Sequence, residues 1–410
     1  MRVAVFTNQF PGPVSTFFAR DMRGLIDAGI DVEVFPIYPY DATLWRYVPD
    51  ILNEKVLPRS KVHHLKLSEG LRSASLRPWK QSRSFLADTF CISKSAIQHG
   101  LDPFTKSTYG FIKAWAWAHK YGSKYDHVLA YWGNYAATCA YLYHRISCPD
   151  VPFSMFLHAE IDLYRNRVFL EQKLLYANNI IVVCDFNRQF LQQCYPATFP
   201  LMKDKIHLHH LGLDLREMPY QTNGRSPKKI IAVGRLEKKK GFDYLINATD
   251  ELKRRGLHVE LDLVGDGTQA RSLKEQAARL GMLDQVKFLG WLHFDQVQLA
   301  MKQATLLCHP SPEIGDAVPT VIKESMALGT PVIGTNVAGI PELLDHGKCG
   351  VLVPPKDVKA LADAIEMLVE KPELRQQYAL AARQYAERKF DLVRNGQELA
   401  AVLGKTSREI

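Results

Sequence analysis

Two carboxylates eight positions apart are the residues of this sequence best placed for chemistry. Asp316 follows a short apolar run, and Glu324 comes eight residues later within an expected helix. Pro319 suits the first turn of that helix, and Gly329 suits the left-handed position that closes it. The apolar run at 330–334 predicts a strand buried on both faces, as in a parallel sheet. Open α/β sheets bind ligands at the carboxyl ends of their strands, so both carboxylates are expected near such an edge.

The elements that must position such residues recur along the chain. Apolar runs at 2–6 and 32–37 flank a helical pattern at 17–28, which predicts a βαβ unit. The loop before this helix contains Gly12 and suits phosphate binding, because free N–H groups and the positive helix end meet there. A plain turn is the alternative. Further strands are expected at residues 127–132, 153–157, 180–184, 230–233, 261–264 and 286–289.

The segment around the two carboxylates carries a longer pattern. Asp316 and Glu324 are followed by Ala-Leu-Gly-Thr-Pro-Val at 327–332 and by Gly-Ile-Pro-Glu at 339–342. These residues resemble the signature of retaining glycosyltransferases of glycosyltransferase family 4, among them bacterial exopolysaccharide and cell-surface glycan glycosyltransferases. The resemblance implies an α/β chain of GT-B architecture, with two Rossmann-like domains facing a central cleft and a C-terminal helix crossing back to the N-terminal domain. It also implies sugar transfer from a UDP- or GDP-sugar to a hydroxyl acceptor in glycan, exopolysaccharide or glycolipid synthesis.

The resemblance assigns roles to individual residues. Asp316 contacts hydroxyls of the donor sugar and Glu324 holds the ribose, although the family usually has Glu at the first position. Arg235 and Lys240 match a Gly-Arg-Leu-x-x-x-Lys-Gly element whose cations hold the donor diphosphate and stabilise its charge as it departs. His158, in a His-Ala-Glu-Ile-Asp-Leu-Tyr segment at a strand end, faces the transferred sugar. Further donor-binding positions are Gly234, Gly12, Ala317, Val318, Pro319, Thr320 and Leu292.

The same resemblance bears on cofactors and mechanism. No metal or other cofactor is expected, because protein cations and helix ends neutralise the diphosphate in such enzymes. Retention is expected by front-face departure and attack, with the leaving phosphate as base, since no residue is an obvious nucleophile. Pro319 lacks a backbone N–H that many family members direct at the sugar, so the identity of the donor sugar stays open.

Three patterns could suggest other chemistry. Residues 265–270 spell G-x-G-x-x-A, but the acid that dinucleotide binding requires at the end of the next strand is missing. His207, His209 and His210 lie on a predicted strand whose successive side chains point to opposite faces, so they predict no metal site. The seven cysteines are scattered without a C-x-x-C pair, which indicates reduced thiols.

Length and composition indicate two globular domains. The chain has 410 residues, of which 47% are hydrophobic, enough for two cores. An N-terminal acceptor-binding domain is expected at 1–214, a linker at 215–229, a nucleotide-sugar-binding domain at 230–388 and a C-terminal helix at 389–410. No run approaches the ~20 apolar residues that span a bilayer, and no signal peptide is evident, so a cytoplasmic protein is expected.

The stretch 55–94 concentrates positive charge. It holds nine Lys and Arg and few acids, with Leu76, Trp79 and Phe85 among them. This composition favours a surface for a glycan or lipid-linked acceptor, with peripheral contact to an anionic membrane. A solvated helical face is the alternative. No nucleic-acid-binding module is recognisable, so no nucleic-acid partner is expected.

Two other functions are compatible with the same fold. A GT-B sugar-nucleotide epimerase would lack an acceptor surface. A catalytically inactive GT-B scaffold would bind a sugar nucleotide or a partner without turnover. The presence of Arg235, Lys240 and Glu324 argues against the scaffold, whereas Asp316 in place of Glu keeps it open.

Overall fold

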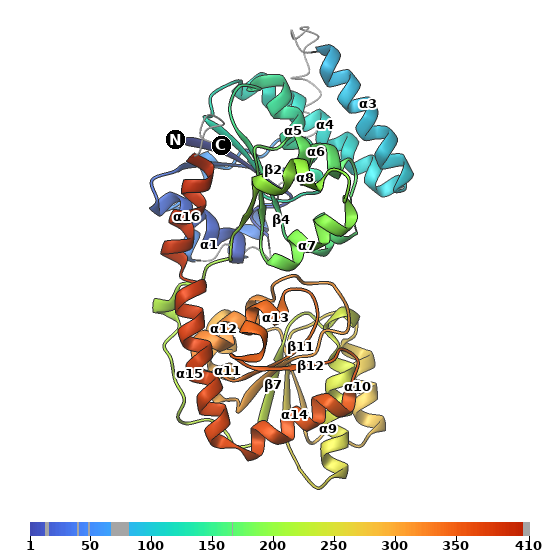
Figure 1. The fold of residues 1–410 in the computed structure, drawn as a ribbon, viewed down its shortest axis with the longest axis vertical. Helices are drawn as coiled ribbons and strands as arrows, with labels where there is room; N and C mark the ends of the chain where they lie inside the picture. The colour runs from blue at the N-terminus through green and yellow to red at the C-terminus, as the bar shows by residue number, and fades with distance from the viewer. Residues whose placement is uncertain (13–15, 39–40, 48–49, 67–81, 166, 405–410) are drawn as a thin grey trace. The chain divides into compact units, whose positions relative to one another are not determined.

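A computed structural model describes residues 1–410 except 13–15, 39–40, 48–49, 67–81, 166 and 405–410 (Figure 1). The chain divides into two compact units, each built around its own parallel sheet. Unit 1 comprises Met1–Gly212 and Leu392–Ile410, and unit 2 comprises Leu213–Asp391. Within the described ranges, no helix is both long and apolar enough to cross a membrane.

Unit 1 is organised by a six-stranded parallel sheet in the order β2-β1-β3-β4-β5-β6. The central strands are buried along their length, as expected for a parallel sheet covered by helices. Because the chain leaves β1 for β2 on one side and later returns to β3 on the other, the ends of β1 and β3 form a topological switch point. The strands are β1 (Arg2–Thr7), β2 (Asp31–Pro36), β3 (His127–Ala130), β4 (Phe153–Leu157), β5 (Asn179–Val182) and β6 (Ile206–Leu208).

The helices of unit 1 include two that the sequence patterns do not predict, α3 and α4. They fill much of the interval between β2 and β3. Local capping is visible at α5, where the Asn134 side chain accepts from the N–H of Ala136. The α-helices are α1 (Thr16–Asp27), α3 (Ser82–Gln98), α4 (Leu101–Tyr121), α5 (Tyr135–Ser147), α6 (Leu170–Tyr176), α7 (Asp185–Cys194), α8 (Phe199–Met202) and α16 (Leu392–Gly404).

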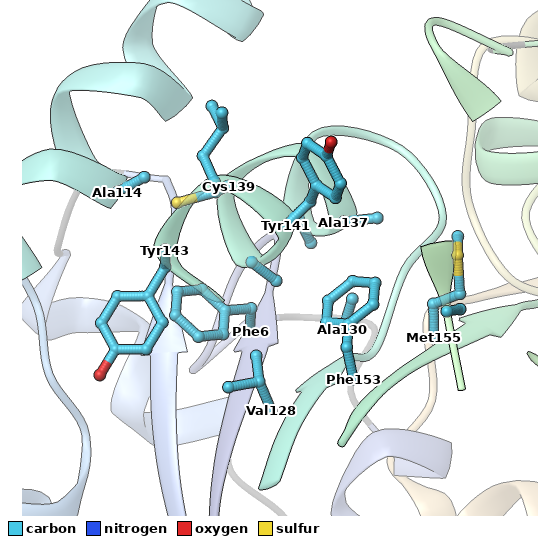
Figure 2. Close-up of a cluster of buried hydrophobic side chains, with 14 of the residues drawn as sticks. Phe6, Ala114, Val128, Ala130, Ala137, Cys139, Tyr141, Tyr143, Phe153 and Met155 are labelled. Atoms are coloured by element: carbon cyan, nitrogen blue, oxygen red, sulfur yellow. The ribbon is translucent and has the colours of Figure 1, made fainter. Parts of the chain in front are cut away.

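The core of unit 1 is rich in aromatic rings. Phe6 of β1 stacks on Phe35 of β2 with ring centroids 4.9 Å apart, and it lies 5.1 Å from the Tyr143 ring of α5. Figure 2 shows side chains of β1, β3, β4, α4 and α5 gathered in this cluster. The contacts tie α4 and α5 to one face of the sheet, so the strand ends on that side are held in fixed positions.

The C-terminal helix α16 packs against α1 in unit 1 (Figure 1). The backbones meet at two glycines: a Cβ built on Gly24 would lie 2.9 Å from the Cα of Gly396. Leu392, Leu399 and Leu403 of α16 are buried. The prediction that the last helix crosses back to the N-terminal domain is therefore confirmed.

Unit 2 contains a second six-stranded parallel sheet, in the order β12-β11-β10-β7-β8-β9. Its first strand β7 lies beside its fourth strand β10, which is the doubly wound arrangement of a Rossmann-like sheet. The fold class predicted from sequence is thus confirmed. The strands are β7 (Lys229–Val233), β8 (Glu260–Val264), β9 (Val286–Gly290), β10 (Leu306–His309), β11 (Val332–Thr335) and β12 (Val351–Val353).

Helices cover the second sheet, and the segment before β7 packs on the same unit. Arg225 donates to the carbonyls of Met301, Lys302 and Ala304 at 2.9–3.1 Å, and its burial lowers its pKa to about 10. Residues 215–229, predicted as a linker, therefore belong to unit 2, and Lys229 already begins β7. The helices are α9 (Phe242–Arg254), α10 (Ala270–Arg279), α11 (Phe294–Gln303), α12 (Thr320–Leu328), α13 (Ile340–Leu343), α14 (Val358–Glu370) and α15 (Pro372–Lys389).

Candidate active site

The switch point of unit 2 brings together the two segments that the sequence singled out. The loop after β7 carries Gly234, Arg235 and Lys240, and the loop after β10 carries Asp316. Since β7 and β10 are neighbours, these loops leave the sheet side by side at its carboxyl edge. This is the edge at which doubly wound sheets bind ligands.

Glycines allow the loops to approach closely. Gly241 has φ 69°, and a Cβ there would lie 2.0 Å from the carbonyl oxygen of Pro310, in the loop after β10. Gly265 has φ 131°, and a Cβ there would lie 2.0 Å from the carbonyl oxygen of Gly234. Gly265 is the first glycine of the G-x-G-x-x-A pattern. Its close packing under the β7 loop gives that pattern a structural reason, independent of dinucleotide binding.

The cations of the β7 loop pair with carboxylates of the same unit. Lys240 forms an ion pair with Asp316, so the structure brings these two predicted site residues together. Arg235 Nη1 lies 2.6 Å from Glu237 Oε1, and Lys239 Nζ lies 3.5 Å from Glu237 Oε2. Arg235 is largely exposed, whereas Lys240 is nearly buried. The result is a compact group of three cations and two carboxylates at the switch point.

The charge of Lys240 controls the ionisation of Asp316. Burial by itself raises the pKa of the Asp316 carboxyl, but the nearby Lys240 charge and its hydrogen bond outweigh burial, so the pKa is lowered below its ordinary value. Asp316 is therefore a carboxylate at neutral pH. It can accept hydrogen bonds from hydroxyl groups of a ligand.

His309 belongs to this group, although the sequence patterns did not identify it. It ends β10 in a buried position, and its Nε2 lies 3.1 Å from Ser311 Oγ. Burial and then the Lys240 charge lower its pKa to about 3, so the ring is neutral at physiological pH. Its Nδ1 has no hydrogen-bond partner among the described atoms. This histidine can be recognised as part of the site only from its tertiary packing next to Lys240 and Asp316.

The remaining predicted donor positions, except Gly12 in unit 1, lie on the same unit. Pro319 is the N-cap residue of α12 with φ −63° and ψ 114°, so the prediction that it lies in the first helical turn is wrong by one residue. Glu324 is buried in the second turn, and Gly329 closes the helix with φ 78°. Leu292 follows β9, the edge strand two positions from β7. The loop before α12 contains Ala317 and Val318, and Thr320 begins the helix.

His158 lies at the end of β4 in unit 1, inside a ring of aromatic side chains. Its ring centroid is 4.5 Å from Trp132, 4.9 Å from Tyr131, 5.3 Å from Phe156 and 5.5 Å from Phe17. The side chain is buried, and its Nε2 has no hydrogen-bond partner among the residues that the structure describes. A buried, unsatisfied nitrogen costs stability unless a ligand contacts it, which makes His158 a candidate binding residue.

Asp162 fixes the orientation of His158. Its carboxylate accepts the backbone N–H groups of Gly133, His158 and Ala159 at 3.2, 3.0 and 2.8 Å. His158 Nδ1 lies 3.4 Å from the same carboxylate. A proton on Nδ1 would be directed at this carboxylate and would leave Nε2 as an acceptor. Asp162 lies in the predicted His-Ala-Glu-Ile-Asp-Leu-Tyr segment, but its role was not predicted.

A buried lysine stabilises the loop between β3 and α5. Lys173 Nζ donates to the carbonyls of Gly133 and Asn134 at 2.9 and 3.2 Å and to Thr138 Oγ1 at 3.1 Å. Burial lowers its pKa to about 7. It thereby joins the end of β3 to the start of α5. No sequence signal distinguishes this lysine from a surface one.

Gly12 and the histidines named in the sequence analysis have few polar contacts. Gly12 is buried after β1, next to the side chain of Gln9, while residues 13–15 of the same loop lie outside the described ranges. His207 contacts Asn179 Oδ1 at 3.1 Å, and His209 contacts Asp21 Oδ1 at 3.1 Å. Across the described residues, no group of three or more His, Cys, Asp or Glu side chains has the arrangement of a metal site.

Comparison with known proteins agrees with this architecture. Residues 218–385 match the family Glycosyl transferases group 1. Over 98% of its length the chain is 26% identical to the amylovoran biosynthesis glycosyltransferase AmsK of Erwinia amylovora, covering 99% of that protein. A segment covering 42% of the chain is 31% identical to 44% of the alpha-D-kanosaminyltransferase of Streptomyces kanamyceticus.

Solved structures share the fold at low sequence identity. The structure of Anabaena HepE in complex with UDP superposes with a TM-score of 0.67 at 19% identity, covering 98% of both chains. Sucrose-phosphate synthase from Thermosynechococcus elongatus superposes with a TM-score of 0.71 at 18% identity, also covering 98% of each chain. The fold is that of GT-B glycosyltransferases of known structure, and the match of residues 218–385 to Glycosyl transferases group 1 supports a glycosyltransferase.

Proposed function

We propose that this glycosyltransferase is a retaining hexosyltransferase of family 4 that uses a UDP- or GDP-sugar donor. The observation that carries the proposal is the Lys240–Asp316 pair at the switch point, with Arg235 on the same loop. A nucleotide-sugar requires both kinds of group, cations for its diphosphate and a carboxylate for its sugar hydroxyls. Further support comes from AmsK, which is named for amylovoran biosynthesis, and from HepE, which was solved with UDP.

The proposed reaction breaks the bond between the sugar C1 and the β-phosphate oxygen. Arg235 and Lys240 stabilise the negative charge that develops on the departing diphosphate, so no metal is required for this step. The acceptor hydroxyl attacks C1 on the face that the phosphate leaves, and its proton passes to the departing phosphate oxygen. The C1 configuration is retained. Asp316 accepts hydrogen bonds from sugar hydroxyls. On unit 1, the Nε2 of His158 offers an acceptor to a hydroxyl of a bound ligand.

The acceptor and the location belong to the same proposal. The acceptor is a hydroxyl of a glycan or a lipid-linked saccharide in exopolysaccharide or glycolipid synthesis, and the protein acts in the cytoplasm, with peripheral contact to the membrane. The name of AmsK supports the choice of a polysaccharide pathway.

A donor screen followed by product analysis tests the proposal. We expect UDP- or GDP-sugars to raise the thermal stability of the protein, and an accepted donor to give a product whose anomeric configuration, read by NMR, equals that of the donor. An inverted product would contradict the retaining mechanism. Epimerised donor without transfer would indicate an epimerase, and donor binding without any turnover would indicate a scaffold.

Substitution of the two cations tests the site itself. Arg235→Ala and Lys240→Ala should each lower kcat/KM by about 10²–10³, because one preorganised charge contact contributes roughly 3 kcal/mol to the barrier. Lys238→Ala, an exposed neighbour on the same loop, is the control and should retain activity. Wild-type turnover in both Arg235 and Lys240 variants would show that the diphosphate is bound elsewhere.

A further inference from the structure

Two half-buried aromatic side chains lie beside His158 at the carboxyl edge of the unit 1 sheet. Trp132 follows β3, and Phe17 lies in the first turn of α1. Their rings pack edge to face with centroids 5.6 Å apart. The Trp132 ring lies 4.5 Å from the His158 ring, and the Phe17 ring lies 5.5 Å from it. Phe17, Trp132 and His158 are named the β3 platform.

The core of unit 1 holds the β3 platform in place. Trp132 packs on the aromatic core, and the adjacent Tyr131 ring lies 6.3 Å from Phe17 and 4.9 Å from His158. Tyr131 is itself anchored, because its hydroxyl donates to Asp21 Oδ2 at 2.6 Å. Rings held in this way lose little side-chain entropy when a ligand packs on them.

The two carboxylates linked to these rings already have donors within the protein. Asp21 accepts from the Tyr131 hydroxyl, and its other oxygen lies 3.1 Å from His209 Nε2. Asp162, beside His158, accepts three backbone N–H groups. The β3 platform therefore offers a ligand aromatic faces and an imidazole nitrogen. These groups suit an uncharged ring better than a phosphate, which is bound by cations and N–H donors.

Two buried polar atoms at this sheet edge lack hydrogen-bond partners among the described residues. One is His158 Nε2, after β4, and the other is Asn8 Oδ1, after β1. Both side chains are more than nine-tenths buried. Because β1, β3 and β4 are neighbouring strands, Asn8, Trp132 and His158 follow strands that end side by side at the switch point. Hydroxyl groups of a ligand are donors that can satisfy such atoms, which otherwise cost stability.

Aromatic faces next to hydrogen-bond acceptors match the chemistry of a pyranose ring. One face of many pyranoses presents C–H groups that pack on an aromatic ring, and the hydroxyls around its rim donate hydrogen bonds. The cations proposed for the donor diphosphate, Arg235 and Lys240, belong to unit 2. The chemistry of the β3 platform therefore fits the acceptor better than the nucleotide.

The apolar residues named in the basic stretch 55–94 do not belong to this platform. Phe85 was expected at the surface, and this expectation is wrong because its ring packs inward on Trp115 with centroids 5.0 Å apart. Leu76 and Trp79 lie outside the described residues. Trp115 is half-buried on α4 of the same unit, which makes it a matched control for Trp132.

We propose that the β3 platform binds an uncharged pyranose ring of the acceptor saccharide. The C–H face of the ring packs on Trp132 and Phe17, and a ring hydroxyl donates to His158 Nε2. The inference rests on the proposed function, in which a sugar is transferred to a hydroxyl acceptor, but binding of the ring requires neither donor nor turnover. The platform thereby selects the saccharide part of an acceptor.

Saturation-transfer NMR with the methyl pyranosides of glucose, galactose and mannose tests the platform without a donor. We expect at least one of the three to bind the wild-type protein, with saturation strongest on the protons of one ring face. Trp132→Leu should weaken binding about tenfold, because the stacking face is lost, whereas Trp132→Phe keeps an aromatic face and should retain most of the binding. Trp115→Leu should bind like wild type.

Three results would overturn the proposal. The first is wild-type protein that binds none of the three glycosides at millimolar concentrations. The second is wild-type affinity in Trp132→Leu. The third is uridine binding that depends on Trp132 and displaces the glycoside, which would make the platform a nucleobase site.

A measurement on the wild-type protein covers the case in which Trp132→Leu fails to fold. The indole N–H resonance of Trp132, assigned from its absence in Trp132→Phe, should shift as the bound glycoside is titrated. An unshifted resonance during binding would place the sugar elsewhere and overturn the proposal. Arg235→Ala should lose turnover but still bind the glycoside, so this inference and the proposed function fail independently.

Discussion

At the scale of single residues, three cations of the loop after β7 have carboxylate partners. Arg235 and Lys239 contact Glu237, and Lys240 contacts Asp316. A diphosphate must therefore compete with these carboxylates for the same donors. It can do so because it carries more charge, and because Arg offers a planar fork that fits phosphate oxygens. Asp316, once released from Lys240, is available to sugar hydroxyls.

Asp316→Asn should lower kcat/KM for the accepted donor by about 10- to 100-fold, since a hydrogen bond to a charged group is worth ~1.5–3 kcal/mol. Steady-state kinetics with saturating acceptor measures the effect. Glu313→Gln, an exposed carboxylate three residues earlier, is the control and should be near wild type. If the Glu313 variant is damaged and the Asp316 variant is not, the assignment of the first acid is wrong.

Asp162→Asn should impair transfer by roughly 10- to 100-fold through His158, because an amide can donate to Nδ1 and favour the other tautomer. Nitrogen NMR of the His158 ring reports the tautomer directly, and the wild type should carry its proton on Nδ1. Asp150→Asn, an exposed acid of the same unit, is the control. An unchanged tautomer in an impaired Asp162 variant would assign this carboxylate a purely structural role.

At the scale of elements, the sequence predicted the strands well and two helices poorly. Apolar runs such as 261–264 and 330–334 signal buried parallel strands directly, and the glycosyltransferase class and the GT-B fold inferred from the flanking motifs are confirmed. Helix α3 was missed because apolar residues occupy both its buried face, with Ile92, and its exposed face, with Phe90. Such a helix lacks the polar side that makes amphipathic periodicity visible.

The site residues that escaped prediction are those defined by tertiary contacts. His309 and Lys173 carry no local motif, and their chemistry arises only from burial beside groups that are distant in sequence. Lys240 and Asp316 come together because their loops follow the neighbouring strands β7 and β10. The sequence patterns indicated both strands. The functional roles assigned to Arg235, Glu324 and His158 remain predictions.

The close packing of α1 on α16 predicts that a larger residue at the contact lowers stability. Gly396→Ala should lower the free energy of unfolding, because its Cβ would lie 2.6 Å from the Cα of Gly24 and force the backbones apart. Overpacking costs typically ~1–3 kcal/mol, which exceeds the gain of about 1 kcal/mol in helix propensity. Gly404→Ala, which has no neighbour within 4 Å, is the control and should be neutral or stabilising. Equal melting temperatures for both variants, read by calorimetry, would contradict the tight contact.

At the scale of the whole molecule, the chain leaves unit 1, builds unit 2 and returns. Entry and exit of unit 2 lie together, since the N–H of Leu213 donates to the carbonyl of Phe390 at 2.7 Å. The last helix then completes unit 1, although it is synthesised after all of unit 2. The stability of the N-terminal unit therefore depends on the C-terminal residues of the sequence.

Deletion of residues 392–410 should unfold or loosen unit 1 and spare unit 2. Three buried leucines of α16 would be lost, and each buried leucine contributes about 1.5–3 kcal/mol, a sum comparable to the whole stability of a domain. Hydrogen exchange should show loss of protection in β1 and β3 but native protection in β7 and β10. Deletion of residues 405–410 alone, beyond α16, is the control and should leave both units protected. Native protection of β1 in the longer deletion would mean that unit 1 is stable without its last helix, and the close contact of Gly24 with Gly396 would then have little energetic weight.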